Sequence, residues 1–259
     1  MAYFKAKATA TEKEDTKTPY IIYWPHTLPR SDTRTSVKPA DYIQVVSIDP
    51  GTVNYCIRIE KRYFNGWIIP VYYNIWALRK RGKIDTSLPN TIYANLTAKL
   101  DEIKDFLVES HMVVIERQLS VNYQSTRVMQ HTISYFHIIL RDNPLYPIIY
   151  DIAPTLKGRM LGAPPKISKT ELKEWAVIKA RELLEVRQDK WSLSILNSSK
   201  KKDDLGDVVC QVEALFVYWG EEPQTHPLPT GANSFHPLNE IKASSSSETK
   251  RKIRIKIKQ

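Results

Sequence analysis

The apolar positions of the chain predict a mixed α/β domain over residues 42–220. Short runs rich in β-branched residues predict strands over Tyr42–Asp49, Tyr55–Phe64, Trp67–Leu78, His111–Glu116 and Tyr146–Ile152. Apolar residues at helical spacing predict helices over Thr91–Glu109, Gln124–Leu140, 169–187 and Asp204–Trp219. An antiparallel hairpin followed by alternating strands and helices indicates a mixed sheet with helices packed on it.

Turn and cap residues refine this pattern. Asn65-Gly66 is a strong hairpin turn, and Pro70 predicts a local irregularity in the third strand. Residues 154–165 contain Gly, Pro and basic side chains, and we expect a loop there. Ser168 and Glu171 have the spacing of a capping box, which predicts the start of the next helix.

The two ends of the chain differ from this domain. Residues 1–41 contain scattered Pro, Thr and charged side chains, and we expect a mostly disordered N-terminal arm. Residues 221–259 form a Pro- and Ser-rich linker followed by a basic tail. The net charge of the chain is +10, and most of this excess lies in the two ends. If the domain binds nucleic acid, its own basic residues must therefore gather on one face.

Composition excludes several classes of protein. Hydrophobic residues make up 42% of the 259 residues, enough for a substantial core, yet no apolar run is long enough to cross a membrane. Cys56 and Cys210 both lie in apolar runs, so we expect reduced core thiols and no disulfide framework. The first twenty residues lack the features of a secretion signal. We expect an intracellular protein with no membrane partner and no organic cofactor.

Two predicted strands end in a carboxylate. Asp49 ends the first strand, directly before Pro50-Gly51, and Glu116 ends the strand that contains Met112-Val113-Val114-Ile115. If these strands are neighbours, the two acids lie side by side at one edge of the sheet. Taken alone, Asp49-Pro50-Gly51 is an ordinary turn, and Glu116 is also explained as a strand-end residue paired with Arg117 or a Lys.

The last predicted helix adds two more acids. Asp204 and Asp207 are three residues apart and therefore lie on one helical face. Asp203 or Asp204 alone is also an expected N-cap. Four carboxylates suit Mg²⁺ or Mn²⁺ better than zinc. Two such ions can activate a water and stabilise the leaving oxygen of a phosphodiester, so the set predicts a two-ion metal site.

Three segments resemble the motifs of RuvC-like Holliday junction resolvases, especially the poxvirus and iridovirus branch: Val46-Ser47-Ile48-Asp49-Pro50-Gly51, Val114-Ile115-Glu116-Arg117-Gln118 and Lys202-Asp203-Asp204-Leu205-Gly206-Asp207. The similarity extends to the segment from Ala153 to Gly158. It covers roughly Tyr42 to Trp219.

The resemblance implies a ribonuclease H-like fold, a homodimer, Mg²⁺ dependence and paired nicks at four-way DNA junctions during recombination, replication or repair. By motif position it assigns Asp49, Glu116, Asp204 and Asp207 as metal ligands, leaves Asp203 ambiguous, and places Lys157 near the scissile phosphate. For a viral member, it implies action in the host cytoplasm or nucleus.

One position departs from the family. Bacterial members have an aromatic residue three positions after the second acid, where this chain has Leu119, and Tyr123 is the nearest aromatic. Apolar positions over residues 121–140 fit either a dimer seam or a core helix. The basic residues that are candidates for phosphate contacts are Arg79, Lys80, Arg81, Lys83, Arg117, Arg127, Lys157, Arg159 and Lys166.

Three other functions remain open. Asp49-Pro50-Gly51-Thr52 also resembles the first phosphate loop of sugar kinases and chaperone-type ATPases, but those proteins need a second such loop, and this chain has only 8 Gly. A nuclease of the same fold acting on RNA–DNA hybrids or flaps would have the same acids. A non-catalytic junction-binding protein is disfavoured, because clustered carboxylates are costly without a metal.

Overall fold

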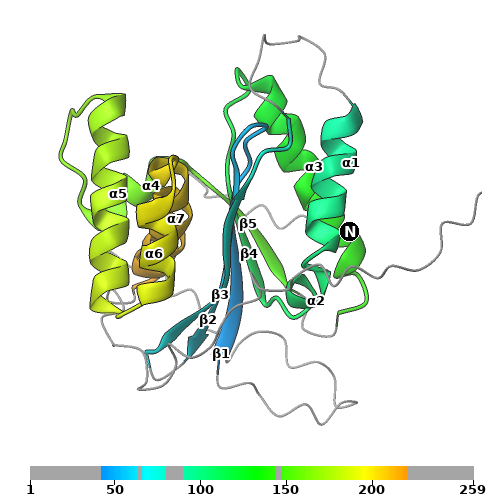
Figure 1. The fold of residues 1–259 in the computed structure, drawn as a ribbon, viewed down its shortest axis with the longest axis horizontal. Coiled ribbons are helices and arrows are strands. Elements are labelled where there is room, and N and C mark those ends of the chain that lie inside the picture. Colours follow the sequence, from blue (N-terminus) through cyan, green and yellow to red (C-terminus); the bar gives the residue numbers. More distant parts are fainter. Residues whose placement is uncertain (1–41, 64–65, 80–89, 144–146, 221–259) are drawn as a thin grey trace, which may run out of the picture.

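A central sheet lies between two layers of helices (Figure 1). The computed structural model describes residues 42–63, 66–79, 90–143 and 147–220. The sheet has five strands in the order β3-β2-β1-β4-β5. The predicted arm over residues 1–41, the predicted linker and tail over 221–259, and the basic residues Lys80, Arg81 and Lys83 lie outside the described residues.

The first three strands form an antiparallel meander. β1 (Tyr42–Asp49) pairs with β2 (Tyr55–Tyr63), which pairs with β3 (Ile68–Trp76). A Cβ atom at Gly51 would lie 2.3 Å from the carbonyl oxygen of Asn54, so only glycine fits the turn that follows β1. Pro70 lies opposite Glu60, next to a shift in register. The predicted irregularity at Pro70 is therefore confirmed.

The other two strands are parallel to β1. β4 (Met112–Glu116) pairs with β1, and β5 (Ile148–Ile152) pairs with β4. Ile48 lies opposite Ile115, so the next position on each strand brings Asp49 and Glu116 to neighbouring strand ends. The condition set from the sequence for these two acids to lie side by side, that their strands be neighbours, is met.

One face of the sheet is covered by α1 (Asn90–Asp101), α2 (Lys104–Leu107) and α3 (Tyr123–Ile139). The sequence predicted a single helix over Thr91–Glu109, and the structure divides it at Glu102 and Ile103. The predicted apolar stripe is nevertheless buried in one core cluster, with Ile92, Leu96, Leu100, Ile103 and Leu107. The break leaves this stripe intact because Ile103 and Leu107 still pack into the same cluster.

The opposite face is covered by α4 (Leu156–Leu161), α5 (Lys169–Val186), α6 (Lys190–Ser198) and α7 (Lys202–Tyr218). The expected loop over residues 154–165 is wrong in part, since α4 lies within it and buries Leu156 against the sheet. α6 had no sequence prediction. The capping box of Ser168 and Glu171 is confirmed at the start of α5.

Both cysteines are buried free thiols, as predicted. None of the helices in the described ranges has the length and hydropathy needed to cross a membrane.

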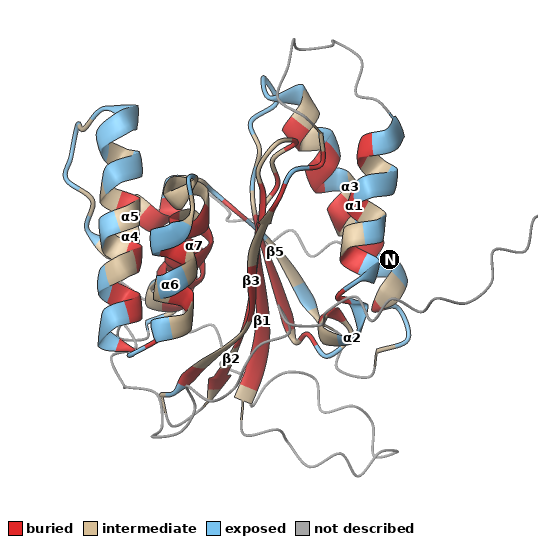
Figure 2. Cartoon of the chain, in the orientation of Figure 1, coloured by how far each residue is buried: buried red, intermediate tan, exposed pale blue. Residues whose placement is uncertain are grey.

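β1 is buried along most of its length (Figure 2), and successive residues of a strand face opposite layers. Val46 and Ile48 pack in the cluster with α1 and α3, whereas Ile43 and Val45 pack against α7. The same alternation directs Ser47 and Asp49 toward α7. On β4, Met112 and Val114 face α7, so Glu116 shares that side of the sheet. The strand-end acids therefore face the helix that contains Asp204 and Asp207.

A buried ionic network joins β2 to the α5–α7 layer. Glu60 accepts hydrogen bonds from Arg58 Nε and Arg62 Nε, both at 2.7 Å. Arg62 and Arg187 both reach Glu213 on α7, and Arg58 also binds Asp189, the N-cap of α6. Burial alone would raise the pKa of Glu60, but the guanidinium groups of Arg62, Arg58 and Arg187 lower it to about 2. Glu60 is therefore ionised and doubly paired inside the fold.

We expect Glu60→Gln to lower the free energy of unfolding by about 3–5 kcal/mol, because it leaves two buried guanidinium groups short of a counter-charge. Urea denaturation at pH 7 measures this change. Glu109→Gln is the matched control, since Glu109 forms only an exposed ion pair with Lys61 and its loss should cost less than about 1 kcal/mol. Equal effects of the two substitutions would contradict a stabilising role for the network.

Candidate active site

Two acids from different elements contact one buried lysine, and a third acid lies nearby. Lys157 of α4 is buried, and its Nζ lies 2.8 Å from Glu116 Oε2 at the end of β4 and 2.8 Å from Asp207 Oδ1 on α7. The charges of Glu116 and Asp207 raise the pKa of Asp49 and that of Lys157 lowers it, so Asp49 lies within electrostatic range of all three. The structure thus brings Asp49, Glu116, Asp207 and Lys157 together, as the resemblance implied.

The structure shows which groups the Lys157 ammonium contacts, which the sequence did not indicate. The resemblance placed it near a scissile phosphate, whereas here its ammonium group lies between two carboxylates. Burial lowers the pKa of a lysine, but Asp207 and Glu116 outweigh this effect and raise the pKa of Lys157. The side chain is therefore a permanent cation that offsets the negative charge of the site.

The positive charge of Lys157 nevertheless offsets only part of the negative charge of the acids. Burial raises the pKa of Asp49 well above its usual range, and Glu116 and Asp207 raise it further, against the opposing effect of Lys157. Burial likewise raises the pKa of Asp207 to about 6, with Lys157 again opposing the change. One lysine does not neutralise this group of carboxylates, which leaves it able to attract additional cations.

Asp204 lies at the same end of the sheet. Its Oδ2 is buried without a hydrogen-bond partner, which is costly for a carboxylate. Burial raises the pKa of Asp204, while a hydrogen bond from the Asn54 side chain lowers it. Asn54 belongs to the turn after Asp49 and was not predicted as a site residue, because a turn asparagine has no distinguishing pattern.

Asp203 is directed away from this group. Its carboxylate pairs with Lys173 of α5 and, at 3.9 Å, with Lys201. The expectation that Asp203 or Asp204 caps α7 is wrong, because the N-cap position is Lys201 and it makes no side-chain capping hydrogen bond. The helix begins earlier than its apolar periodicity indicates. Asp203, which the sequence left open as a metal ligand, therefore pairs with lysines outside the group formed by Glu116, Asp207 and Lys157.

The donor set fits a divalent metal ion, although the arrangement is not that of a loaded site. Among the residues that the structure describes, no three His, Cys, Asp or Glu side chains are close enough together to hold an ion as they stand. Lys157 Nζ already occupies the space between Glu116 and Asp207. Carboxylate oxygens, one of them buried and unpaired, are the ligands that Mg²⁺ and Mn²⁺ prefer. Binding at this site would require Lys157 to move.

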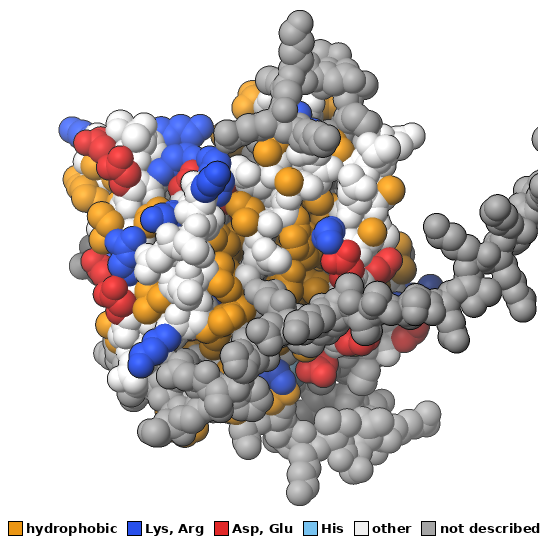
Figure 3. Space-filling view, in the orientation of Figure 1, with side chains coloured by type: hydrophobic (Ala, Val, Ile, Leu, Met, Phe, Trp, Pro, Cys, Tyr) orange, Lys and Arg blue, Asp and Glu red, His pale blue; other side chains and the backbone are white. Residues whose placement is uncertain are grey.

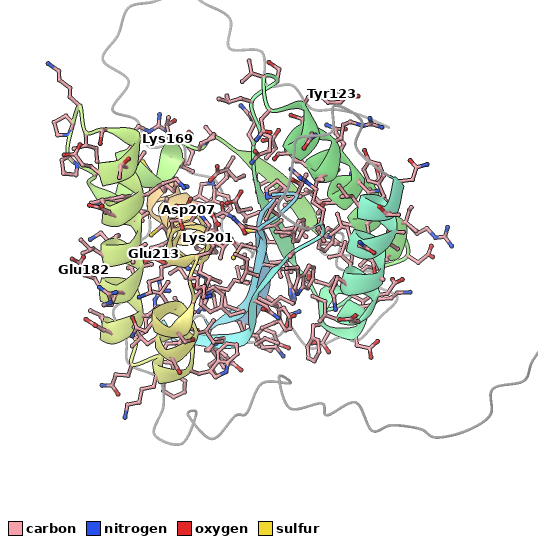
Figure 4. The ribbon with its side chains drawn as sticks, turned by 45° about the horizontal axis from the view of Figure 1, so that its top comes forward. Tyr123, Lys169, Glu182, Lys201, Asp207 and Glu213 are labelled. Atoms are coloured by element: carbon pink, nitrogen blue, oxygen red, sulfur yellow. The ribbon has the colours of Figure 1, made fainter. Side chains whose placement is uncertain are left out.

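Exposed apolar residues and basic residues border the site. Immediately after Glu116, Leu119 and Val121 are 63% and 89% exposed, and Tyr123 is also exposed. Figure 4 shows Tyr123 on α3, across the sheet from Lys169, Lys201 and Asp207. Figure 3 shows Lys and Arg side chains gathered at the end of the α4–α7 layer where α5 begins. The acids therefore lie between an apolar loop and a basic helical rim.

The predicted phosphate contacts have different surroundings. Arg117 pairs with Asp151 at the exposed surface, and Arg127 donates a hydrogen bond to the Tyr123 hydroxyl at 2.9 Å. Arg79 Nε binds Thr52 beside the Asp49 turn, at 3.2 Å. Arg159 lies over the Tyr218 ring, and Lys166 is exposed. Of the predicted set, Lys157 is buried with the acids.

Comparison with known sequences identifies viral relatives. No protein-family model matches the chain. Uncharacterized protein 170L of Invertebrate iridescent virus 6 is 27% identical over 216 residues, which cover 66% of this chain and 88% of that protein. Uncharacterized protein 97L of Invertebrate iridescent virus 3 is 33% identical over 115 residues, covering 44% of this chain and 52% of that protein.

Comparison with solved structures identifies the fold. The yeast mitochondrial Holliday junction resolvase Ydc2 superposes with a TM-score of 0.50 over 69% of this chain and 81% of its own, at 15% identity. Thermus thermophilus RuvC in complex with a Holliday junction substrate gives a TM-score of 0.45 at 13% identity, covering 68% of this chain and 94% of its own. Taken with the mixed five-stranded sheet, the Ydc2 match shows that this domain shares the ribonuclease H-like fold of that protein.

Proposed function

We propose that the chain is a metal-dependent endonuclease that resolves four-way DNA junctions by paired phosphodiester hydrolysis. The observation that supports this most directly is the convergence of Glu116 and Asp207 on Lys157, with Asp49 within electrostatic range of all three. This arrangement lies at the carboxyl ends of two parallel strands, on a fold shared with a junction resolvase. Its iridovirus relatives make a viral enzyme, acting on replicating or recombining DNA in the host cell, the proposed setting.

Each site residue has a defined task in this proposal. Asp49, Glu116, Asp204 and Asp207 would hold Mg²⁺ or Mn²⁺, in a site for two ions. When bound, such ions supply an activated water and stabilise the leaving oxygen of a phosphodiester. Lys157, displaced from Glu116 and Asp207, becomes a free cation within reach of the same region, where it can bind a phosphate oxygen.

Substrate binding would come from the border of the site. Basic side chains there contact the DNA backbone, which gives affinity that falls with salt and depends little on sequence. A four-way junction has two equivalent strands to cut, and a two-fold homodimer presents two sites with matching symmetry. α3 leaves Ile138 exposed, which makes it a candidate for the dimer contact.

Cleavage of labelled DNA tests the function. We expect symmetric nicks in a four-way junction with Mg²⁺ and none with EDTA, while matched duplex, flap and RNA–DNA hybrid remain intact. Denaturing gels that map both cut strands give the measurement. Preferential cutting of hybrid or flap would support a different nuclease of this fold. Tight junction binding without any cutting would leave a binding protein and refute the proposed catalysis.

Asp49→Asn should lower the cleavage rate at least about a thousandfold, equivalent to about 4 kcal/mol of activation barrier, because Asp49 is central to the acid group. Junction binding should persist, since the change removes a negative charge. Single-turnover cleavage and gel-shift titration measure the two properties separately. Asp142→Asn, at an exposed residue paired only with Arg141, is the control and should cleave normally. Parallel loss of binding and cleavage would argue against a purely catalytic Asp49.

Stability should depend on pH and metal through the same acids. The pKa of Asp207 is raised from 3.8 to about 6, so its proton is held more tightly in the folded state than in the unfolded state. Relative to Asp207→Asn, the metal-free wild type should therefore lose stability as pH rises from about 4 to about 6. This subtraction cancels the contributions of His111 and His131, which are common to both proteins.

Added Mn²⁺ should reverse this loss at pH 7. An ion at 100 times its dissociation constant stabilises the fold by about 2.7 kcal/mol. Urea melts of wild type and Asp207→Asn, with Mn²⁺ and with EDTA, measure the effect. Equal stabilisation of the two proteins would place the ion elsewhere.

A further inference from the structure

Ser47 forms a buried polar link between β1 and α7. Its Oγ donates a hydrogen bond to the Val208 carbonyl at 2.7 Å and accepts one from Gln211 Nε2 at 2.6 Å. Gln211 Nε2 also donates to the Ile48 carbonyl at 3.1 Å. Ser47 and Gln211 are both buried, so these bonds form without competition from solvent. Three hydrogen bonds therefore connect the strand of Asp49 to the helix of Asp207.

Ser47 and Gln211 each lie close to one acid, Asp49 on β1 and Asp207 on α7 respectively. Ser47 is two residues before Asp49, which places the two side chains on the same face of β1. Gln211 is four residues after Asp207, which places it one helical turn further along the same face of α7. Because a strand and a helix are rigid over these distances, the link sets the separation between the two acids.

The free energy of folding does not explain why polar residues occupy positions 47 and 211. Gln211 Oε1 is buried with no hydrogen-bond partner, and such an unpaired group is unfavourable. The neighbouring positions at the same interface, including Val45 and Val212, are apolar and well packed. An apolar pair at 47 and 211 would avoid the unpaired oxygen but would lack directional contacts. Hydrogen bonds depend on direction as well as distance, so they define the register of α7 along β1 more narrowly than an apolar contact at the same positions would.

We propose that Ser47 and Gln211 are positioning residues for the metal site. Their hydrogen bonds fix α7 along β1, so that Asp207 lies at the depth of Asp49 and Glu116. Neither residue touches the substrate or the ion, and both act through the acids. The proposal rests on the proposed function, because it assigns the link to the metal site of that nuclease.

Mn²⁺ binding by the full-length protein tests the link without DNA. We expect Ser47→Ala and Gln211→Met each to weaken Mn²⁺ affinity about tenfold, measured by electron paramagnetic resonance titration. The double variant should be no weaker than the single variants by more than about twofold, because both substitutions break the same connection. In junction cleavage, kcat should fall while the KM for DNA stays unchanged, since the surface for DNA is untouched.

Cys210→Ala is the matched control. Cys210 is the neighbour of Gln211 on α7, is equally buried, and directs its Sγ toward the Ala176 carbonyl on α5 instead of toward β1. It should lower the melting temperature as Ser47→Ala does and leave Mn²⁺ affinity unchanged. Equal losses of affinity in the control and the link variants would show a general effect of destabilisation and overturn the proposal.

Crystal structures of Ser47→Ala and Gln211→Met, grown without metal, provide a second test. The proposal requires Asp207 to shift relative to Asp49 and its ion pair with Lys157 to lengthen. Unchanged positions in both variants would overturn it, whatever the metal measurements give. A wild-type protein that binds no Mn²⁺ would refute the metal site of the proposed function, and these structures would still decide whether the link positions Asp207.

Discussion

The repulsion among the carboxylates at the ends of β1, β4 and α7 is the constraint on which the site depends. Two like charges about 4 Å apart repel by about 4 kcal/mol at the effective dielectric constant of a protein surface. The fold opposes this repulsion with Lys157, held between Glu116 and Asp207 by α4. The pairing of β1 with β4 aligns Asp49 and Glu116, and the packing of α7 against the sheet adds Asp207.

Much of this arrangement could be predicted from the sequence because it follows from periodicity. Apolar runs that end in Asp49 and Glu116 indicate strand ends, and the pairing of β1 with β4 brings them together. The spacing of Asp204 and Asp207 likewise follows from the helical repeat. The ion pairs of Lys157 could not be predicted, since they depend on where the short α4 helix packs. The Gly and Pro residues around α4 favour a loop, and tertiary burial of Leu156 outweighs that local preference.

The buried ionic network shows a second limit of sequence interpretation. Arg58 and Glu60 alternate with Ile57 and Ile59, and Lys61 and Arg62 follow, a pattern typical of a strand with one face in solvent. In the structure this face is buried, and its charges pair with Asp189 and Glu213 from helices more than a hundred residues away. The partners of these charges lie in distant segments of the chain, so no local sequence pattern indicates the ion pairs. The α7 helix is thus held to the sheet by ion pairs at one end and by the Ser47 link near the acids.

The crossing of α5 and α7 has a consequence for how this protein tolerates mutation. Gly206 lies between Asp204 and Asp207, and a Cβ atom there would come within 3.1 Å of the Ala176 carbonyl oxygen on α5. The turn that carries both acids is therefore packed tightly against α5. A side chain at Gly206 would require α5 or this turn of α7 to shift by a few tenths of an ångström. The placement of Asp204 and Asp207 therefore depends on a glycine that lies between them and contributes no side chain of its own.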